Sequence, residues 1–173
     1  MAQFSEDYVK QFNAERAIDP ARSALVIIDM QYATGHPDGP LARKMKAEGN
    51  SVTDWRFHRI NSLVIPNNQK LITAMRKAGG RVIYITIGAA LPDCSDAPVH
   101  MRAFFQSVGN YEGQHAHRII EELAPEPGDP IVRKTSMGAF ASTGLDHLLR
   151  SLEREHLFVT GVSTNMCVET TAR

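Results

Sequence analysis

Three reactive side chains each stand just after a short apolar run of this sequence. Asp29 follows the residues ALVII, Lys134 follows PIVR, and Cys167 lies six residues beyond LFVTG. A cysteine attacks an electrophile as the thiolate, although a free thiol with a pKa of about 8.5 is mostly protonated at neutral pH. A carboxylate could accept the thiol proton, and an ammonium group could stabilise the sulfur anion. These residue types together therefore indicate nucleophilic catalysis.

Each of the three residues also has an ordinary structural interpretation. A single cysteine is more often a buried, inert side chain than a nucleophile, an aspartate after a strand is often a loop residue, and most lysines are solvated. The position of Cys167 near the start of a predicted helix favours a thiolate, because the N–H groups and dipole at a helix N-terminus stabilise an anion. The chemical interpretation depends on whether the fold brings the three residues together.

The elements that would position these residues can be recognised from hydrophobic patterns. Short runs rich in β-branched and aliphatic residues predict buried strands, and helical spacing of apolar residues predicts helices. The predicted strands are 23–30, 81–88, 130–134 and 156–162. The predicted helices are 66–80, 113–129, 143–155 and a last one that contains Cys167.

The order of these elements predicts the fold class. Strands that alternate with helices predict an α/β fold with a mainly parallel sheet covered on both faces. Right-handed connections then place the carboxyl ends of all strands along one edge, where such sheets bind ligands. We therefore expect Asp29, Lys134 and Cys167 to meet at this edge. Two long polar segments, 31–62 and 89–114, leave the same edge and are candidate pocket walls or lids.

The composition is that of a globular protein without a strong charge bias. The 173 residues carry a formal net charge of +0, and 43% are hydrophobic and 22% charged, which predicts one domain over residues 1–173. The charge balance gives no reason to expect a nucleic acid or a membrane surface as a partner. No apolar run approaches the roughly 20 residues that span a bilayer. The first 16 residues lack the apolar segment of a signal peptide, so we expect a cytoplasmic protein.

The cysteine content and the end of the chain add two expectations. Cys94 and Cys167 are the only cysteines, which is too few for a disulfide framework, and a reducing cytoplasm would keep both as free thiols. The last residues, NMCVETTAR, have a helical pattern without a glycine or proline stop signal. This pattern predicts that the domain continues beyond Arg173.

The residues around the three reactive positions resemble those of a known family. The motifs ALVIIDMQ, RKTSMGAFASTGLDHLL and FVTGVSTNMCVETTAR, which occur in that order between Ser23 and Arg173, are similar to those of the isochorismatase-like hydrolases, or cysteine hydrolases. The resemblance implies a three-layer α/β/α sandwich with a mainly parallel, Rossmann-like sheet. It implies a catalytic triad of Asp29, Lys134 and Cys167, and assembly into a homo-oligomer such as a dimer or tetramer.

The same resemblance implies how the backbone before the cysteine is used. The family has a non-proline cis peptide bond at the position that joins Val162 to Ser163 here. The backbone N–H groups of Ser163 and Cys167 are thereby implied to form an oxyanion hole, which would stabilise a tetrahedral intermediate. The implied activity is cleavage of a C–N bond in a small amide, ureido or carbamoyl compound through a thioester.

Two departures from other branches of the family narrow this expectation. The nicotinamidase branch binds a metal through an aspartate and a histidine pair after the second strand, where this chain reads ITIGAALPDCSD. We therefore predict no metal and no cofactor, and we do not favour nicotinamide as the substrate. Isochorismatase itself cleaves an ether and lacks the nucleophilic cysteine, so Cys167 argues against isochorismate.

Further residues are candidates for binding a small-molecule substrate. These are Gln31, Tyr32, Trp55, Arg59, Arg102, Phe140 and Thr164. The cluster that contains Trp55 and Arg59 could equally form a subunit interface. His115 and His117 are two residues apart, a spacing that does not put both on one face of a helix, so they are a poor metal-binding pair.

Two other functions remain open from the sequence. The chain could be a catalytically silent relative that serves as a binding or scaffold protein, although a complete triad weighs against this. Alternatively, Cys167 could act as a redox-sensing thiol, with Cys94 as the only candidate for its resolving partner.

Overall fold

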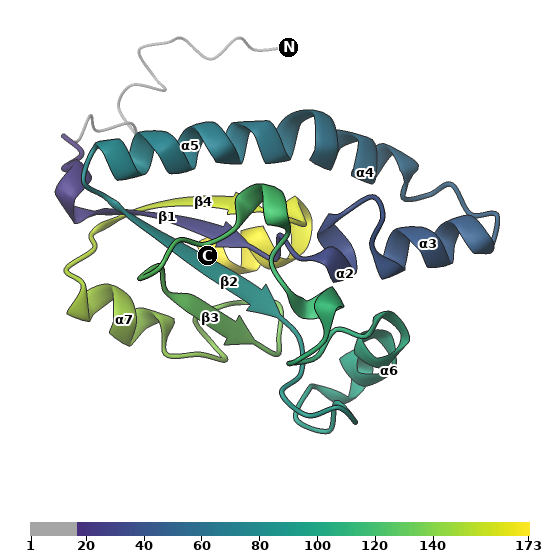
Figure 1. Cartoon of the computed structure of the whole chain (residues 1–173). Coiled ribbons are helices and arrows are strands. Elements are labelled where there is room, and N and C mark those ends of the chain that lie inside the picture. Colours follow the sequence, from purple (N-terminus) through teal and green to yellow (C-terminus); the bar gives the residue numbers. More distant parts are fainter. Residues whose placement is uncertain (1–16) are drawn as a thin grey trace, which may run out of the picture.

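The computed structural model, which describes residues 17–173, contains a four-stranded sheet in the order β3-β2-β1-β4 (Figure 1). All neighbouring strands are parallel. The strands are β1 (Ser23–Ile28), β2 (Arg81–Ile87), β3 (Ile131–Lys134) and β4 (His156–Gly161). The four predicted strands are thus confirmed, and their carboxyl ends lie along one edge of the sheet. The N-terminal residues on which the signal-peptide expectation rests lie outside the described part of the chain.

Helices and helical turns make up the connections between the strands. The α-helices are α2 (Tyr32–Gly35), α3 (Pro40–Ala47), α4 (Asp54–Arg59), α5 (Ile65–Lys77), α6 (Val99–Val108), α7 (Leu145–Ser151) and α8 (Glu169–Ala172). Two π-helical turns span Ile60–Val64 and Thr164–Val168. Single 3₁₀ turns span Pro20–Arg22, His115–His117 and Glu121–Leu123.

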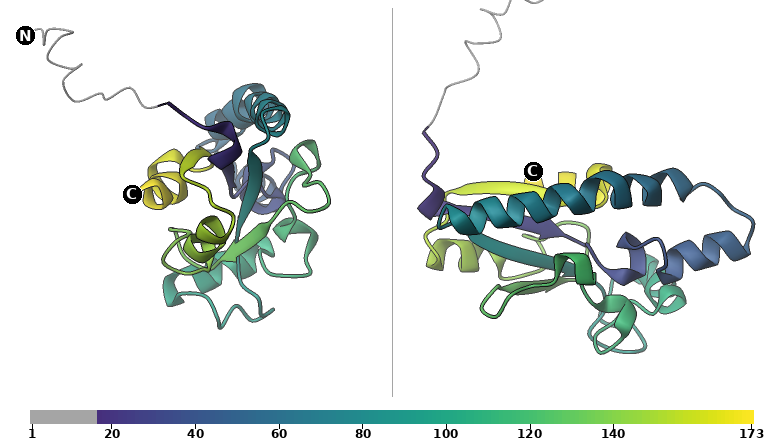
Figure 2. Two further views of the ribbon diagram at one scale, coloured as in Figure 1. Left: turned by 90° about the vertical axis from the view of Figure 1, so that its left-hand side faces the viewer. Right: turned by 45° about the horizontal axis from the view of Figure 1, so that its top comes forward.

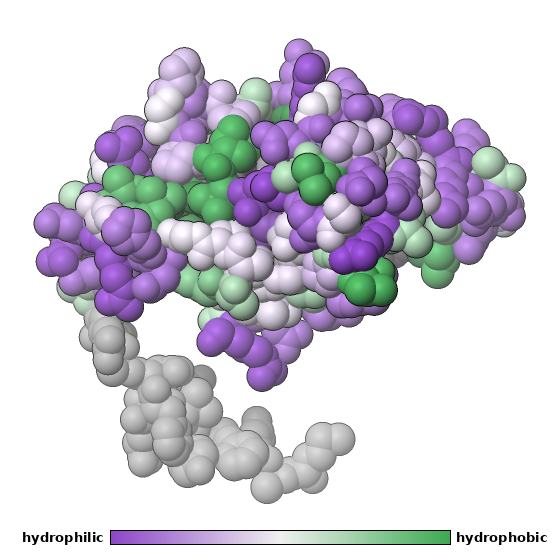
Figure 3. Space-filling model, turned by 90° about the horizontal axis from the view of Figure 1, so that it is seen from below, coloured by the Kyte–Doolittle hydropathy of each residue, from purple (hydrophilic) through white to green (hydrophobic). Residues whose placement is uncertain are grey.

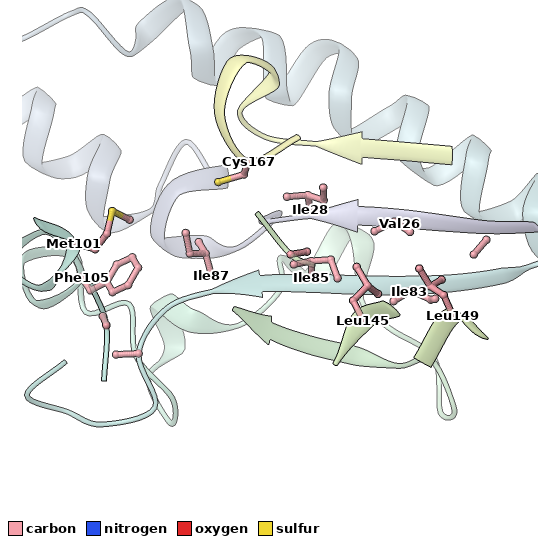
Figure 4. Packing of buried hydrophobic residues seen from close by; sticks show 14 of the residues in the cluster. Val26, Ile28, Ile83, Ile85, Ile87, Met101, Phe105, Leu145, Leu149 and Cys167 are labelled. Carbon is pink, nitrogen blue, oxygen red and sulfur yellow. The ribbon is translucent and has the colours of Figure 1, made fainter. Parts of the chain in front are cut away.

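The central strands are buried on both faces, which explains their unbroken apolar sequences. All six residues of β1 are buried, and successive side chains point to opposite sides of a strand. Val26 and Ile28 pack in one core with α6 and α7, whereas Leu25 and Ile27 pack in a second core with α4 and α5. Figures 2 and 4 show the resulting three layers and the packing of the first core. The α/β/α sandwich is therefore as expected.

The predicted helix at 66–80 is longer than its pattern indicated. α4, the π-helical turn after it and α5 form one continuous helical segment along one face of the sheet (Figure 1). Pro66 lacks an N–H and cannot donate the usual helical hydrogen bond. The π-helical turn lies immediately before it, where Ile65 donates to the carbonyl of Ile60, so the helix passes the proline with a local change of pitch.

The prediction of one helix over 113–129 is wrong. That segment contains two single 3₁₀ turns joined by extended backbone. Its backbone pairs with the residues that follow β1: Ile120 donates to the carbonyl of Met30, and Tyr32 donates to that of Arg118. These groups would bond within the segment if it were a helix, so the pairing with another part of the chain prevents helix formation.

The surface seen from below in Figure 1 is largely polar, with a few small groups of apolar side chains (Figure 3). Among the described residues, no helix combines the length and hydrophobicity needed to cross a membrane.

Candidate active site

Asp29 lies at the carboxyl end of β1 with an unusual backbone conformation. Its N–H donates to the carbonyl of Ile85 at 2.9 Å, which extends the pairing with β2 by one residue. Its φ angle is 55°, in the left-handed region that non-glycine residues seldom adopt and that aspartate and asparagine tolerate best. The residue is 3% exposed. The backbone therefore turns sharply out of the sheet while the carboxylate stays inside it.

Lys134 is the last residue of β3 and is completely buried. Its Nζ lies 2.9 Å from Oδ2 of Asp29 and 3.0 Å from the carbonyl oxygen of Ser136. β2 lies between β1 and β3 in the sheet, so the long lysine side chain crosses the end of β2 to reach the carboxylate. Oδ1 of Asp29 accepts no hydrogen bond from the described residues, which leaves one carboxylate oxygen available to a proton.

A glycine makes the turn from β4 to the cysteine possible. Gly161 has a φ angle of 115°, and a Cβ atom at this position would lie 2.1 Å from the carbonyl oxygen of Ile28. The close approach of β4 to β1 therefore requires a residue without a side chain. The peptide bond one residue further on, between Val162 and Ser163, is cis, which confirms the position expected from the resemblance.

Cys167 lies in the π-helical turn that follows and faces the end of the sheet (Figure 4). It is 7% exposed, and its Sγ lies 3.7 Å from Sδ of Met137. Cys167 is also close enough to Asp29 and Lys134 for both to shift its pKa. The fold therefore brings together the three reactive side chains from the ends of three different strands.

The electrostatics differ from the sequence-based expectation of a resting thiolate. Burial, reinforced by the negative charge of Asp29 and opposed by Lys134, raises the pKa of Cys167 to about 12. Burial also raises the pKa of Asp29, although Lys134, Cys167 and Arg56 act in the opposite direction. At neutral pH the sulfur is therefore a thiol beside its potential proton acceptor. Removal of the side chain from water outweighs the favourable position near a helix start.

Asp29 and Cys167 line a cleft of about 270 Å³ at the carboxyl edge of the sheet, and Lys134 is buried beside Asp29. Much of its wall is apolar and comes from α3, the end of β2, α6 and the segments after β3 and β4. These apolar residues include Leu41, Ile87, Met101, Phe105, Met137 and Val162. Its polar lining consists of Asp29, Thr34, Thr53, Arg56, Ser163 and Cys167. We refer to this space as the cleft.

Arg56 of α4 is a cleft residue that sequence reasoning missed. One terminal nitrogen donates to Oγ of Ser163, and the other donates to the carbonyl of Thr34 at 3.0 Å. A signal for it was present: Phe57 and Ile60 form an apolar stripe on this helix, and Arg56 lies beside that stripe rather than on the opposite face.

Two of the predicted binding residues, Gln31 and Tyr32, lie outside the cleft and hold loops together. The Gln31 side chain is buried, accepts from the backbone N–H of Ile87 at 2.8 Å and donates to the carbonyl of His117 at 2.7 Å. The Tyr32 ring packs against His115, with ring centroids 4.3 Å apart. Neither side chain is part of the cleft lining.

The remaining candidates also lie away from the cleft. Trp55 is 74% exposed, and Arg59 lies over its ring. Arg102 donates to the carbonyls of Ser95 and Ala97 and so fixes its own loop. Phe140 lines a different hollow, near Leu157 and Arg173, and Thr164 is exposed.

In the described part of the chain, the histidines are not grouped with acidic residues or cysteines as metal ligands would be. Within residues 17–173, no three histidine, cysteine, aspartate or glutamate side chains are grouped as they would be around a metal ion. His117 instead contacts Asn110, with Nδ1 3.0 Å from Oδ1, and burial lowers its pKa.

Comparison with known proteins identifies the family. The model of the isochorismatase domain matches residues 23–173. The chain belongs to the isochorismatase family. A cysteine hydrolase from Pseudomonas syringae pv. phaseolicola 1448A is 30% identical, with a TM-score of 0.72 over 91% of this chain and 67% of the other.

Two further structures show the range of similarity to this isochorismatase-family protein. An isochorismatase family protein from Desulfovibrio vulgaris subsp. vulgaris str. Hildenborough is 28% identical, with a TM-score of 0.67 over 87% of this chain and 72% of the other. N-carbamoylsarcosine amidase from Thermoplasma acidophilum is 23% identical, with a TM-score of 0.59 over 87% of this chain and 73% of the other. The latter shares the fold.

Proposed function

We propose that this family member is a cysteine-dependent amidohydrolase that cleaves a C–N bond in a small amide, ureido or carbamoyl compound. The observation that carries the proposal is the position of Cys167 beside the buried ion pair of Asp29 and Lys134, at the base of a cleft. A nucleophile, a proton acceptor and a cation are together where they could act on one carbonyl group.

The first step is attack of the thiol on the substrate carbonyl. As the bond between Sγ and carbon forms, the thiol proton passes to Asp29 and the carbonyl electron pair moves to oxygen. The raised pKa of Cys167 makes this proton transfer necessary, because little thiolate is present beforehand. Lys134 orients the carboxylate through its 2.9 Å bond and offsets negative charge.

The tetrahedral intermediate carries its negative charge on oxygen. The backbone N–H of Ser163 has no hydrogen-bond acceptor among residues 17–173, which supports its proposed role as an oxyanion donor, together with the N–H of Cys167. When the intermediate collapses, the C–N bond breaks and Asp29 gives its proton to the departing nitrogen. A thioester on Cys167 remains.

Hydrolysis of the thioester regenerates the enzyme. Asp29, now unprotonated, accepts a proton from water as the water oxygen attacks the thioester carbon. The second intermediate releases the acid product, and the sulfur regains a proton. The cleft volume of about 270 Å³ supports a small substrate. The amidase from Thermoplasma acidophilum, whose name describes action on a carbamoyl compound, supports C–N cleavage as chemistry compatible with this fold.

The test is ammonia release from a panel of small amides and ureas, combined with mass spectrometry of the intact protein. We expect turnover by the wild type, an acyl adduct on Cys167, and loss of both in Cys167→Ser. Cys94→Ala is the matched control, because Cys94 is a buried thiol outside the cleft. Full turnover by Cys167→Ser would refute the proposal, and absence of turnover and adduct across the panel would favour the binding or scaffold alternative.

A further inference from the structure

Arg56 presents a positively charged group to the cleft without a carboxylate partner among the described residues. Its terminal nitrogens donate to Ser163 Oγ and to the carbonyl of Thr34, both uncharged acceptors. Its Nε is buried and has no hydrogen-bond partner in residues 17–173. A guanidinium group has five N–H donors, so the two bonds to the protein leave further donors unused.

The charges around the cleft do not neutralise Arg56. Asp29 is the acidic residue of the cleft lining, and it is already paired with Lys134 at 2.9 Å. Burial lowers the pKa of Arg56, whereas Cys167 and Asp29 raise it. A partly buried cation without its own counter-ion is costly. Binding of an anion beside it would offset that cost.

We propose that Arg56 binds a carboxylate of the substrate, so that the natural substrates are short ureido or amide acids. This inference rests on the proposed function for the reacting bond, and it adds the chemical class of the rest of the molecule. A planar guanidinium with unused donors matches a carboxylate better than a neutral amide or a hydroxyl group.

The contact between Arg56 and Ser163 limits the length of such a substrate. The side chain of Ser163 accepts from Arg56, while its backbone N–H is the proposed donor to the reacting carbonyl oxygen. A substrate carboxylate bound to Arg56 and a scissile carbonyl bound to the N–H of Ser163 therefore both lie beside Ser163. Only a few substrate atoms separate the two groups. Met101, Phe105 and Met137 provide an apolar wall for those intervening atoms.

A purely structural role for Arg56 is the main alternative. In that case its two bonds would serve only to tie Thr34, after β1, to Ser163, after β4. Such a tie would not make the cleft prefer an anion. The preference of Cys167 for a charged over a neutral reagent of the same shape therefore distinguishes the two roles.

The experiment compares alkylation of Cys167 by iodoacetate and by iodoacetamide at low ionic strength, measured on the Cys167 peptide by mass spectrometry. In both reactions the Cys167 thiolate forms the S–C bond and iodide leaves. Both rates are proportional to the fraction of Cys167 that is thiolate, so this fraction cancels in the ratio of the two rates. The reference is the ratio of the iodoacetate rate to the iodoacetamide rate at Cys167 in the denatured protein. We expect the folded wild type to favour iodoacetate by about tenfold relative to that reference, the size of one charge-assisted hydrogen bond.

Two variants of α4 test whether Arg56 is the residue that gives Cys167 its preference for iodoacetate. Arg56→Gln should bring the ratio close to the denatured reference, whereas Arg59→Gln, which removes an equal charge outside the cleft, should retain the preference. A wild-type ratio at or below the reference would overturn the inference, and this measurement requires no variant to fold. An unchanged ratio in folded Arg56→Gln would overturn it as well.

Two ureas of similar size separate this inference from the proposed function. Hydrolysis of ureidoacetate with a higher kcat/KM than that of n-propylurea, and loss of the difference in Arg56→Gln, would support both. A preference for iodoacetate without hydrolysis of either urea would retain the anion site and count against the proposed function. Hydrolysis of n-propylurea without any preference for iodoacetate would retain the proposed function and refute the anion site.

Discussion

Replacing Lys134 with methionine should destabilise the protein strongly, because it leaves Asp29 as an unpaired carboxylate inside the sheet. The two groups are 2.9 Å apart, and neither is more than 4% exposed. At an effective dielectric constant of about 20, Coulomb's law gives an attraction of about 6 kcal/mol at this distance, before the cost of removing both charges from water. Breaking buried pairs of this kind costs about 3–5 kcal/mol, a large share of the 5–15 kcal/mol that is roughly typical of a folded domain.

The measurement is the free energy of unfolding from urea titrations followed by circular dichroism. Wild type, Lys134→Met, Asp29→Asn and the double variant together form a double-mutant cycle. We expect Lys134→Met to lose about 3–5 kcal/mol. The double variant should lose at least about 2 kcal/mol less than the sum of the two single variants, because it leaves no unpaired charge.

The pH dependence gives a second check with a definite sign. Lys134 opposes the burial that raises the pKa of Asp29, so its removal should raise that pKa further. A carboxyl group with a higher pKa in the folded state binds more protons there, and stability then falls as the pH rises. The deficit of Lys134→Met relative to wild type should therefore shrink as the pH falls below neutral. Additive effects in the cycle, or a deficit that does not change with pH, would refute this account of the ion pair.

Three further predictions concern the thiol, the turn before it and the loop contacts. Because the pKa of Cys167 is about 12, its alkylation by iodoacetamide should accelerate about tenfold per pH unit from about pH 7 to 10; a plateau below pH 8 would contradict the assigned burial. Gly161→Ala should lose about 1–3 kcal/mol or more in urea titrations, because its Cβ would meet the Ile28 carbonyl, and unchanged stability would contradict this. Gln31→Leu leaves the N–H of Ile87 without its acceptor, which should cost about 1–3 kcal/mol and accelerate hydrogen exchange at that amide.

The parallel sheet and the convergence of the reactive residues could be predicted because both follow from local patterns. A strand buried on both faces must be apolar throughout, as β1 is, and parallel strands must end on the same edge. Asp29 follows β1, Lys134 ends β3 and Cys167 lies in the helical turn after β4, so their meeting at one edge could be expected from the order of the strands.

Other features depended on contacts between distant parts of the chain. The segment 113–129 has local features of a helix, but its backbone pairs with the residues after β1. The pKa of Cys167 depends on how completely the neighbouring elements bury it, which no short motif reports. Arg56 could have been recognised as a cleft residue because it lies beside the apolar stripe of its helix. Trp55 and Arg59 were predicted to bind substrate from their residue types alone.

The left-handed backbone at Asp29 restricts which residues can replace it as the gene changes. Asparagine tolerates this conformation and matches aspartate in size, and a single nucleotide change converts an aspartate codon into an asparagine codon. Asparagine is therefore the replacement that disturbs the backbone least, although it leaves the buried Lys134 without its carboxylate partner, whereas most other replacements would also distort the chain. A relative that has lost the proposed proton acceptor is therefore expected to carry asparagine at this position together with an uncharged residue in place of Lys134, because that combination leaves no unpaired buried charge.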